Sequence, residues 1–127
     1  MRRGFTLLEV IVVLIIIGVL AALGFAQFEK VLEKGRGAEA KSTLGQLRSL
    51  QMTYYNEHGS YADDIEYLNA VVPEACQPSH FFSYGCASSG TCTATRCTGS
   101  EGKSPYSAAY EINLDIDGVF DGTPGYF

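Results

Sequence analysis

The stretch from Phe5 to Phe28 constrains the fold most, because it is a run of 24 residues in which only Glu9 carries a charge. As a helix it would measure about 36 Å at ~1.5 Å per residue, enough to cross a ~30 Å hydrocarbon core. Arg2 and Arg3 precede the run, and such positive charges favour the cytoplasmic side. The run therefore predicts one membrane-spanning helix with a cytoplasmic N-terminus.

Two ordinary interpretations of this run are a signal-anchor helix and a cleavable signal peptide. Gly24-Phe25-Ala26 has the small-x-small form that signal peptidase accepts. Against cleavage there, the apolar run is longer than the usual apolar region of about 7–15 residues, and no residue breaks the helix before the cut.

Glu9 is the feature that these two interpretations leave unexplained. A carboxylate in an apolar membrane helix costs several kcal/mol unless it is paired or solvated. The nearest later cation, Lys30, would lie about 30 Å away along the helix, so we expect no local partner. The partner should then come from another chain or be created by processing.

The sequence Gly4-Phe5-Thr6-Leu7-Leu8-Glu9, followed by a long apolar helix, resembles the class III signal of type IV pilins and type II secretion pseudopilins. The resemblance implies that a prepilin peptidase cuts after Gly4 and N-methylates Phe5. It also implies that Glu9 pairs with the amino terminus of a neighbouring subunit. Many major pilins carry Pro where this chain has Ala26, so helix melting near that position is less assured.

The same resemblance implies a non-enzymatic structural subunit of a type IV pilus-like filament that serves adhesion, motility or DNA uptake. The subunit would sit in the inner membrane as a single-pass protein. An assembly platform there would polymerise it with itself or with other pilin-like subunits into an extracellular pilus. The alternatives are a type II secretion pseudopilin in a periplasmic pseudopilus and a membrane-anchored periplasmic binding module that never polymerises.

Beyond Phe28 the apolar residues recur at three- and four-residue steps, which is the spacing of an amphipathic helix. They are Val31, Leu32, Ala40, Leu44, Leu47, Leu50, Tyr54 and Tyr55. Gly35-Arg36-Gly37 indicates either a hinge or close packing, and His58-Gly59 a helix stop with a left-handed glycine cap. We expect a leader at 1–4, a membrane or filament-core helix at 5–28, its amphipathic continuation at 29–58 and a head at 59–127.

The head is predicted to contain a short capped helix and an antiparallel sheet. Asp63-Asp64 precede Ile65, Tyr67, Leu68 and Val71, which indicates a capped short helix or turn. Alternation from Tyr110 to Ile116 predicts a strand, and Asp117-Gly118 a two-residue hairpin turn. The fold class expected is α+β, with a long N-terminal helix packed on a small antiparallel sheet and disulfides.

Four cysteines, Cys76, Cys86, Cys92 and Cys97, lie within 22 positions of the head. In a small exported module they predict two disulfides, which would form in the periplasm or outside the cell. A zinc site would favour a C-x2-C pair, which is absent. Short spacing alone favours Cys76–Cys86 with Cys92–Cys97 among the three pairings.

Three aspartates at the predicted hairpin, Asp115, Asp117 and Asp121, offer oxygen ligands of the kind that calcium prefers. The alternative is a turn without metal, since Asp-Gly turns are common for backbone reasons. A two-residue turn would also put Asp121 on the apolar face opposite Leu114, unless a bulge shifts the strand. No other cofactor is predicted.

Enzymatic and nucleic-acid functions find little support in the sequence. His58 and His80 are the only histidines, and neither sits in a recognisable catalytic motif. The formal net charge is −5, and Lys and Arg make no long run outside the N-terminus, so no specific nucleic-acid recognition is evident.

Overall fold

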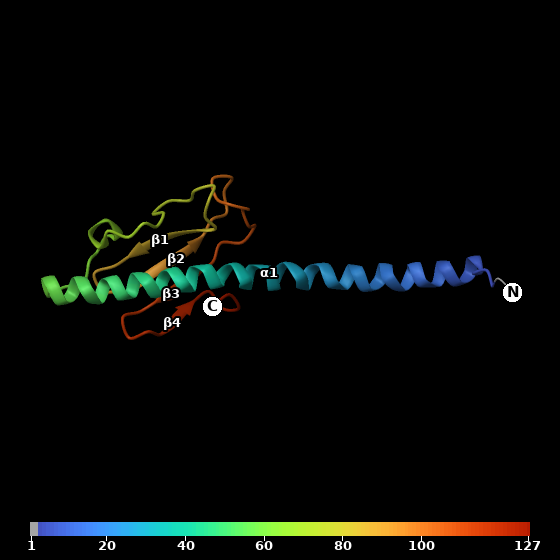
Figure 1. The fold of residues 1–127 in the computed structure, drawn as a ribbon, viewed down its shortest axis with the longest axis horizontal. Coiled ribbons are helices and arrows are strands. Elements are labelled where there is room, and N and C mark those ends of the chain that lie inside the picture. The colour runs from blue at the N-terminus through green and yellow to red at the C-terminus, as the bar shows by residue number, and fades with distance from the viewer. Residues whose placement is uncertain (1–2) are drawn as a thin grey trace. The chain divides into compact units, whose positions relative to one another are not determined.

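The computed structural model describes residues 3–127, so Arg2 of the predicted cationic flank lies outside the described residues. The elements are α1 (Leu7–His58), η1 (Ile65–Leu68), β1 (Phe82–Cys86), β2 (Cys92–Arg96), β3 (Glu111–Leu114) and β4 (Phe120–Gly122) (Figure 1). The predicted α+β fold, with one long N-terminal helix, an antiparallel sheet and disulfides, is confirmed.

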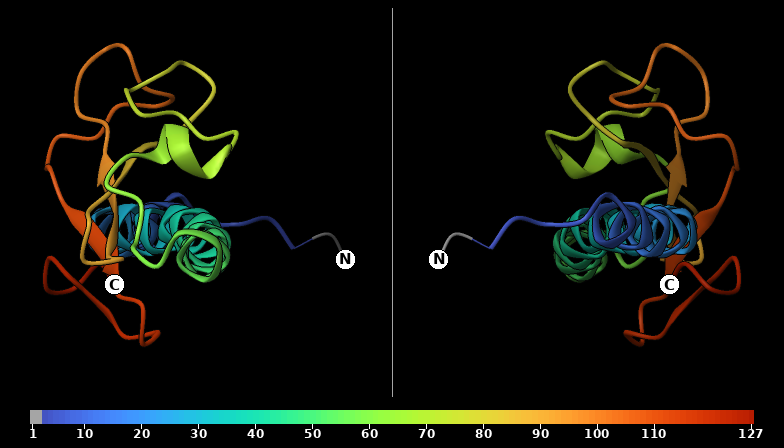
Figure 2. Two further views of the ribbon diagram at one scale, coloured as in Figure 1. Left: turned by 90° about the vertical axis from the view of Figure 1, so that its left-hand side faces the viewer. Right: turned by 90° about the vertical axis from the view of Figure 1, so that its right-hand side faces the viewer.

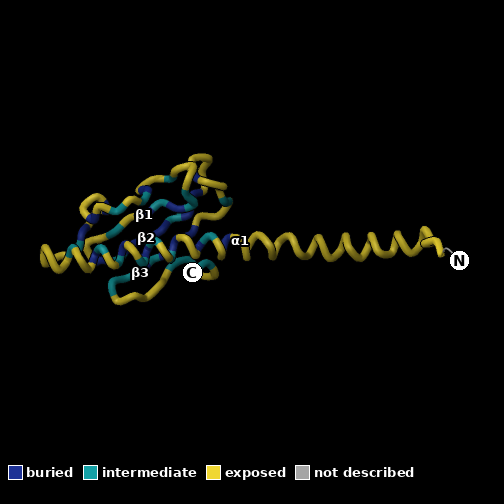
Figure 3. Tube along the Cα trace, in the orientation of Figure 1, coloured by how far each residue is buried: buried dark blue, intermediate teal, exposed yellow. Residues whose placement is uncertain are grey.

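The chain divides into two compact units, Met1–Glu33 and Lys34–Phe127, which are described separately. In the first unit every residue from 3 to 32 is exposed (Figure 3). By length and composition α1 is able to cross a membrane, and its most apolar window, near the N-terminus, is not buried at all. The apolar residues of this unit are therefore left without protein neighbours.

In the second unit, residues 34–58 of α1 pack against the sheet. Ala40, Leu44 and Leu47 are buried, as the periodicity predicts, and Leu50 and Tyr54 are partly buried. Tyr55 is instead exposed and stacks on Tyr61, with ring centroids 4.6 Å apart. Val31 and Leu32, which were also expected on this face, are exposed and belong to the first unit.

The sheet is a four-stranded antiparallel meander in the order β1-β2-β3-β4. Alternate residues of its three longer strands face the core, because side chains in a strand alternate between its two faces. The buried members are Phe82, Tyr84, Cys92, Ala94, Arg96, Ile112 and Leu114, with Tyr110 just before β3. η1 and β4 lie to opposite sides of α1 (Figures 1 and 2).

The hairpin between β3 and β4 differs from the predicted two-residue turn. Leu114 pairs with Phe120, and the Asp115 N–H donates to the Val119 carbonyl at 3.1 Å, which leaves a three-residue loop. Gly118 closes the loop at φ 91°, where glycine is favoured because it lacks Cβ. The added residue shortens the strand predicted to reach Ile116, and it pairs Asp121 with Asn113 instead of Leu114. A bulge-type shift thus removes Asp121 from the apolar face.

Both predicted helix signals near the head are confirmed. Gly59 adopts φ 76° and donates its N–H to the Tyr55 carbonyl at 2.8 Å, which ends α1 at His58. The Asp64 carboxylate accepts the Glu66 N–H at 3.0 Å and caps η1. Of the two interpretations of Gly35-Arg36-Gly37, close packing holds at Gly37, where an added Cβ would lie 3.4 Å from Ile112 Cδ1.

The two disulfides join Cys76 to Cys97 and Cys86 to Cys92, so the pairing favoured by short spacing was wrong. Cys86 and Cys92 face one another across the β1–β2 hairpin, with Cα atoms 4.1 Å apart. Cys97 directly follows β2, and its N–H donates to the Phe81 carbonyl, which brings it to the segment that contains Cys76. Strand register, and not sequence distance, decides the pairing.

Candidate assembly site at the N-terminus of α1

Glu9 and Thr6 form a capping box at the start of α1. The Thr6 N–H and Oγ1 donate to Glu9 Oε2 at 2.8 and 3.0 Å, and the Glu9 N–H donates to Thr6 Oγ1 at 3.3 Å. Each side chain satisfies a backbone donor that the first helical turn leaves without an intrahelical acceptor. The arrangement explains why the helix begins at Leu7, directly after Thr6.

The expectation that Glu9 has no local partner is therefore wrong in one respect. Thr6-Leu7-Leu8-Glu9 has the S/T-x-x-E form of a capping box before an apolar run, which provides uncharged partners for the carboxylate. These contacts are hydrogen bonds and supply no counter-charge. Within residues 3–127, Glu9 makes no ion pair. The charge of the carboxylate therefore still requires a cation in an apolar environment.

The surroundings of Glu9 are apolar and open. Together with it, the residues that line a shallow hollow on this part of α1 are Phe5, Leu8, Val10, Val12, Val13 and Leu14. The Phe5 side chain is 89% exposed, and an added Cβ on Gly4 would meet no atom within 4 Å. The predicted cleavage point between Gly4 and Phe5 is thus sterically accessible, although the cleavage itself stays a prediction.

The structure does not bring the predicted calcium ligands Asp115, Asp117 and Asp121 together as a group. Asp115 accepts the Val119 N–H at 2.7 Å and Asp121 accepts the Gly122 N–H at 2.7 Å, so these two carboxylates serve the hairpin backbone. Within residues 3–127, no group of three or more His, Cys, Asp or Glu side chains is arranged to hold a metal. Asp115 and Asp121 thus have a backbone role in the turn, as Asp residues commonly do.

The two histidines make local contacts only. His58 stacks on Tyr54, with ring centroids 4.0 Å apart, and its Nδ1 lies 3.1 Å from the Tyr54 carbonyl. His80 Nδ1 lies 2.8 Å from Oγ of the adjacent Ser79 on the surface. Neither contact includes the third, orienting group that a catalytic constellation needs.

Two buried polar residues organise the head and were missed by sequence reasoning. Gln51 is wholly buried, and its amide bonds both backbone polar groups of Ala62. Arg96 is 1% exposed and donates to the carbonyls of Phe81, Cys97 and Ser104. The signal for Gln51 was its place on the apolar face of the helix. The only signal for Arg96 was its inward position in the alternation of β2.

Comparison with known proteins identifies the N-terminal segment. Residues 1–25 match the family described as the prokaryotic N-terminal methylation motif. The match contains the Gly4–Glu9 stretch and most of the apolar run, which are the residues that carry the resemblance to pilins and pseudopilins.

Curated relatives carry the names of pilus and secretion proteins. The chain is 39% identical over 62 residues to the type IV major pilin protein PilA of Myxococcus xanthus, covering 49% of this chain and 28% of that protein. It is 35% identical over 77 residues to the type II secretion system core protein G of Dickeya chrysanthemi, covering 61% and 50%. It is 28% identical over 85 residues to the fimbrial protein EcpC of Eikenella corrodens, covering 58% and 56%.

These matches confirm the predicted resemblance to type IV pilins and type II secretion pseudopilins. The aligned regions span between 28% and 56% of the length of these three relatives. The names include both pilus and secretion proteins, so similarity alone does not separate the two functions.

Proposed function

We propose that this chain is a non-enzymatic structural subunit of a type IV pilus-like filament that serves adhesion, motility or DNA uptake. The observation that carries the proposal is Glu9 in the first turn of an exposed apolar helix, four residues after Phe5, within a matched methylation motif. A soluble protein would not leave this many apolar residues exposed. A plain anchor would gain nothing from the carboxylate.

The proposed route begins in the inner membrane, with the N-terminus in the cytoplasm. A prepilin peptidase removes residues 1–4 and methylates the new amino terminus at Phe5. An assembly platform then moves the subunit into a filament of identical or similar subunits. In this division, 5–28 forms the filament core, 29–58 carries the head at 59–127, and the acidic head faces solvent.

The physical role of Glu9 in this route is to set the register between subunits. Cleavage creates a charged amine one residue before Thr6, whose N–H already binds the Glu9 carboxylate. A neighbouring amine placed beside that carboxylate neutralises both charges in the apolar core. A subunit out of register would leave a buried charge unpaired, which is strongly disfavoured.

Packing supplies the rest of the assembly energy. Lipid already suits the apolar side chains of 5–28, so transfer from membrane to filament gains little hydrophobic free energy. Helix–helix packing and the pair formed by Glu9 and the amine therefore decide specificity. A contact of this kind repeats head to tail without closing, which produces an open helical filament.

A type II secretion pseudopilin is the second candidate, and the similarity to a secretion system core protein G favours it. A pilus subunit and a pseudopilin differ in the phenotype that their deletion causes. Deletion of a pilus subunit removes surface filaments, whereas deletion of a pseudopilin leaves exported enzymes in the periplasm. Deletion of a membrane-anchored binding module that never polymerises would have neither effect.

The experiment that tests the proposal separates the charge of Glu9 from its capping role. Glu9→Val removes both, whereas Glu9→Gln keeps a side chain that can close the capping box but carries no charge. Both variants should insert in the membrane and give a strongly reduced yield of sheared filament. Glu29→Gln removes a charge outside the apolar run and serves as the control. Normal filament yield from Glu9→Gln would show that the residue acts as a cap and would overturn the proposed role.

A further inference from the structure

The sheet of the head has two edges, and they differ in what covers them. The outer edge of β1 is occupied at its middle, where the Tyr84 N–H donates to the Pro73 carbonyl at 2.9 Å. β4 lies at the other edge, and within residues 3–127 it pairs with β3 alone. An open edge carries backbone donors and acceptors that can pair with a strand of another chain. β4 is therefore the edge of the sheet to which a further strand could add.

The register of β4 decides which of its backbone groups point outward. The Asp115 N–H donates to the Val119 carbonyl at 3.1 Å, which marks a hydrogen-bonded pair at the start of the hairpin. Bonded and non-bonded pairs alternate along an antiparallel ladder, so Asp121 bonds to β3, whereas Phe120 and Gly122 occupy non-bonded positions. The N–H and C=O groups of Phe120 and Gly122 therefore point away from β3 and form the open edge.

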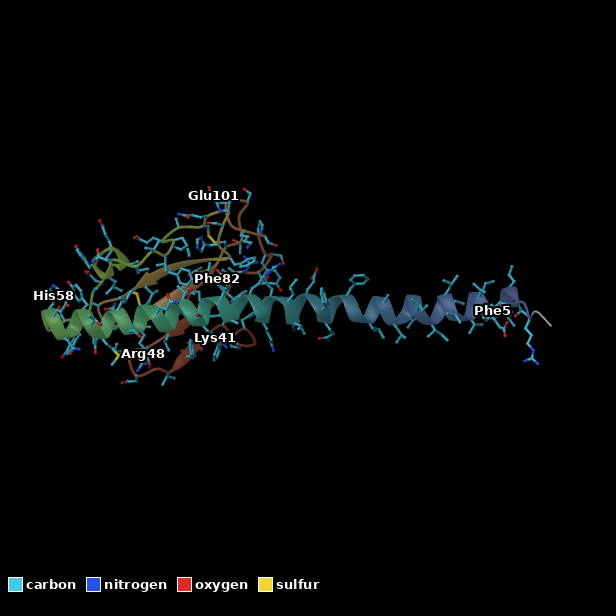
Figure 4. The ribbon with its side chains drawn as sticks, in the orientation of Figure 1. Phe5, Lys41, Arg48, His58, Phe82 and Glu101 are labelled. Carbon is cyan, nitrogen blue, oxygen red and sulfur yellow. A yellow bond between two sulfur atoms is a disulfide. The ribbon has the colours of Figure 1, made fainter. Side chains whose placement is uncertain are left out.

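The side chains beside this edge are apolar. Val119, Phe120 and Phe127 are all exposed. Lys41 Nζ lies 5.7 Å from the centroid of the Phe120 ring, and Figure 4 shows Lys41 on the side of α1 where β4 lies. Free backbone groups next to exposed apolar side chains form the combination that promotes pairing of an edge strand with another chain.

The Asp121 side chain occupies one of the two outward N–H donors of β4. Its Oδ1 accepts the Gly122 N–H at 2.7 Å. Gly122 adopts φ 146°, and an added Cβ would clash with the Glu111 carbonyl oxygen, so the backbone conformation here requires glycine. The Gly122 N–H is therefore available to an incoming strand only if the Asp121 side chain moves away.

A second copy of the chain would bring a second Asp121 to the same place. In an antiparallel two-fold pair of β4 strands, the register that uses all three residues sets Phe120 opposite Gly122 and Asp121 opposite Asp121. Side chains in such opposite positions have Cβ atoms about 4.5–5.5 Å apart, so two like charges would meet. Asp121 shares its face of the sheet with Asn113, whereas Lys41 approaches Phe120 on the other face. Lys41 therefore does not neutralise this repulsion.

We propose that Asp121 prevents β4 of one copy from pairing with β4 of a second copy. It acts in two ways, because it holds the Gly122 N–H and because it sets like charges opposite one another. The two-fold pair that it excludes is closed, so such a pair would remove subunits from any open assembly. The inference goes beyond the proposed function, since it concerns the head of the chain whether or not a filament forms.

Substitutions at position 121 separate the two effects. Asp121→Asn keeps an oxygen that can accept the Gly122 N–H but removes the charge. Asp121→Lys removes the acceptor but again sets like charges opposite one another, and Asp121→Val removes both. Light scattering after size-exclusion chromatography measures the protein mass per particle of the full-length chain in detergent micelles. Asp121→Val should double this mass relative to the wild-type chain, and Asp121→Asn and Asp121→Lys should do so only at higher protein concentration.

Two further variants show whether the association uses β4. Asn113→Val is the matched control, because Asn113 lies opposite Asp121 on the same face but in β3, which is paired on both sides. It should leave the mass per particle unchanged. Phe120→Pro, added to Asp121→Val, removes an outward N–H and spares the hydrogen bonds between β3 and β4. It should return the mass per particle to the wild-type value.

The wild-type mass in Asp121→Val at every protein concentration would overturn the proposal. Dimers that persist after Phe120→Pro, or that form equally in Asn113→Val, would overturn it as well. Near-ultraviolet circular dichroism shows whether each variant is folded. If Asp121→Val does not fold, Asp121→Asn and Asp121→Lys decide the question: a raised mass per particle in either one supports the proposal, and the wild-type mass in both overturns it.

Discussion

The side chain of Gln51 is paired at both ends with the backbone of Ala62. Its Nε2 donates to the Ala62 carbonyl at 2.8 Å, and its Oε1 accepts the Ala62 N–H at 2.9 Å. Gln51 is wholly buried, and Ala62 is 1% exposed. The pair therefore anchors the segment that leaves α1 to the helix itself.

Replacing Gln51 with Ala should destabilise the head by about 2–4 kcal/mol, because two buried backbone groups lose their partners. The chain has eight tyrosines and no tryptophan, so near-ultraviolet circular dichroism of the detergent-solubilised protein follows its thermal unfolding. Gln46→Ala, at an exposed position of the same helix, should change the midpoint little. Equal effects of the two substitutions would contradict the assigned role of Gln51.

Tyr84 provides a pH-dependent prediction. Burial raises the pKa of its hydroxyl above the ordinary value of 10.0, and the carboxylate of Glu39 adds to this, whereas the Thr43 side chain opposes it. The unfolded chain then loses the proton first as the pH rises. The stability that Tyr84 contributes is therefore present below about pH 10 and is lost as the pH rises through the folded-state pKa.

Tyr84→Phe should reduce the alkaline loss of stability, and Tyr67→Phe, at an exposed tyrosine, is the matched control. Near pH 7, Tyr84→Phe should be neutral or stabilising by about 1 kcal/mol, because the buried hydroxyl makes no hydrogen bond of good geometry. Thermal unfolding at pH 7 and pH 10.5 (roughly half a unit above the ordinary value) measures both effects. An unchanged alkaline profile in Tyr84→Phe would show that other groups cause the loss.

Arg96→Lys should destabilise the head by about 3 kcal/mol, although the charge is kept. The forked guanidinium reaches the carbonyls of Phe81, Cys97 and Ser104, and a single ammonium cannot reproduce that geometry. The loop at 97–105 should then become more sensitive to limited proteolysis. Arg48→Lys is the control, since the Arg48 side chain donates to the Ile116 carbonyl at 2.9 Å and should cost less. Equal protease sensitivity in the two variants would contradict this assignment.

The two disulfides should contribute unequally to the free energy of unfolding, and their pairing can be checked directly. Mapping of unreduced peptides should recover Cys76 with Cys97 and Cys86 with Cys92. Sequence separations of 21 and 6 correspond to about 3.4 and 2.4 kcal/mol in the loop-entropy account. Serine at Cys76 and Cys97 should therefore lower the unfolding midpoint more than serine at Cys86 and Cys92. The reverse order would show that native contacts, and not loop length, dominate.

Features with a local physical cause could be read from the sequence. The apolar face with Ala40, Leu44 and Leu47 follows from helical period, and the glycine cap at Gly59 from backbone sterics. The burial of Ile112 and Leu114 follows from strand alternation. The capping box of Thr6 and Glu9 is equally local, although the prediction for Glu9 took only charged groups as its partners.

Features that depend on strand register could not be read in the same way. Cys86 meets Cys92 only because β1 and β2 pair in one register, and the extra residue in the β3–β4 loop moves Asp121 to the other face. Gln51 and Arg96 are polar residues whose burial is tolerated because distant backbone groups accept their hydrogen bonds. Their partners are defined by the fold and not by neighbouring residues.

Processing at Gly4 is the step on which the creation of the Phe5 amine depends. Replacing Gly4 with a bulky residue should block cleavage, so that full-length precursor accumulates in the membrane and filaments are lost. Immunoblotting of membrane and sheared fractions measures this. Normal mature subunit from such a variant would show that the cut lies elsewhere.

The central claim is that Glu9 works with an amino terminus created at Phe5, and intact mass spectrometry of the subunit from sheared filaments tests it most directly. We expect a chain that begins at Phe5 and carries a methyl group on its amine. A chain that retains Met1, or one that begins at Gln27, would contradict it.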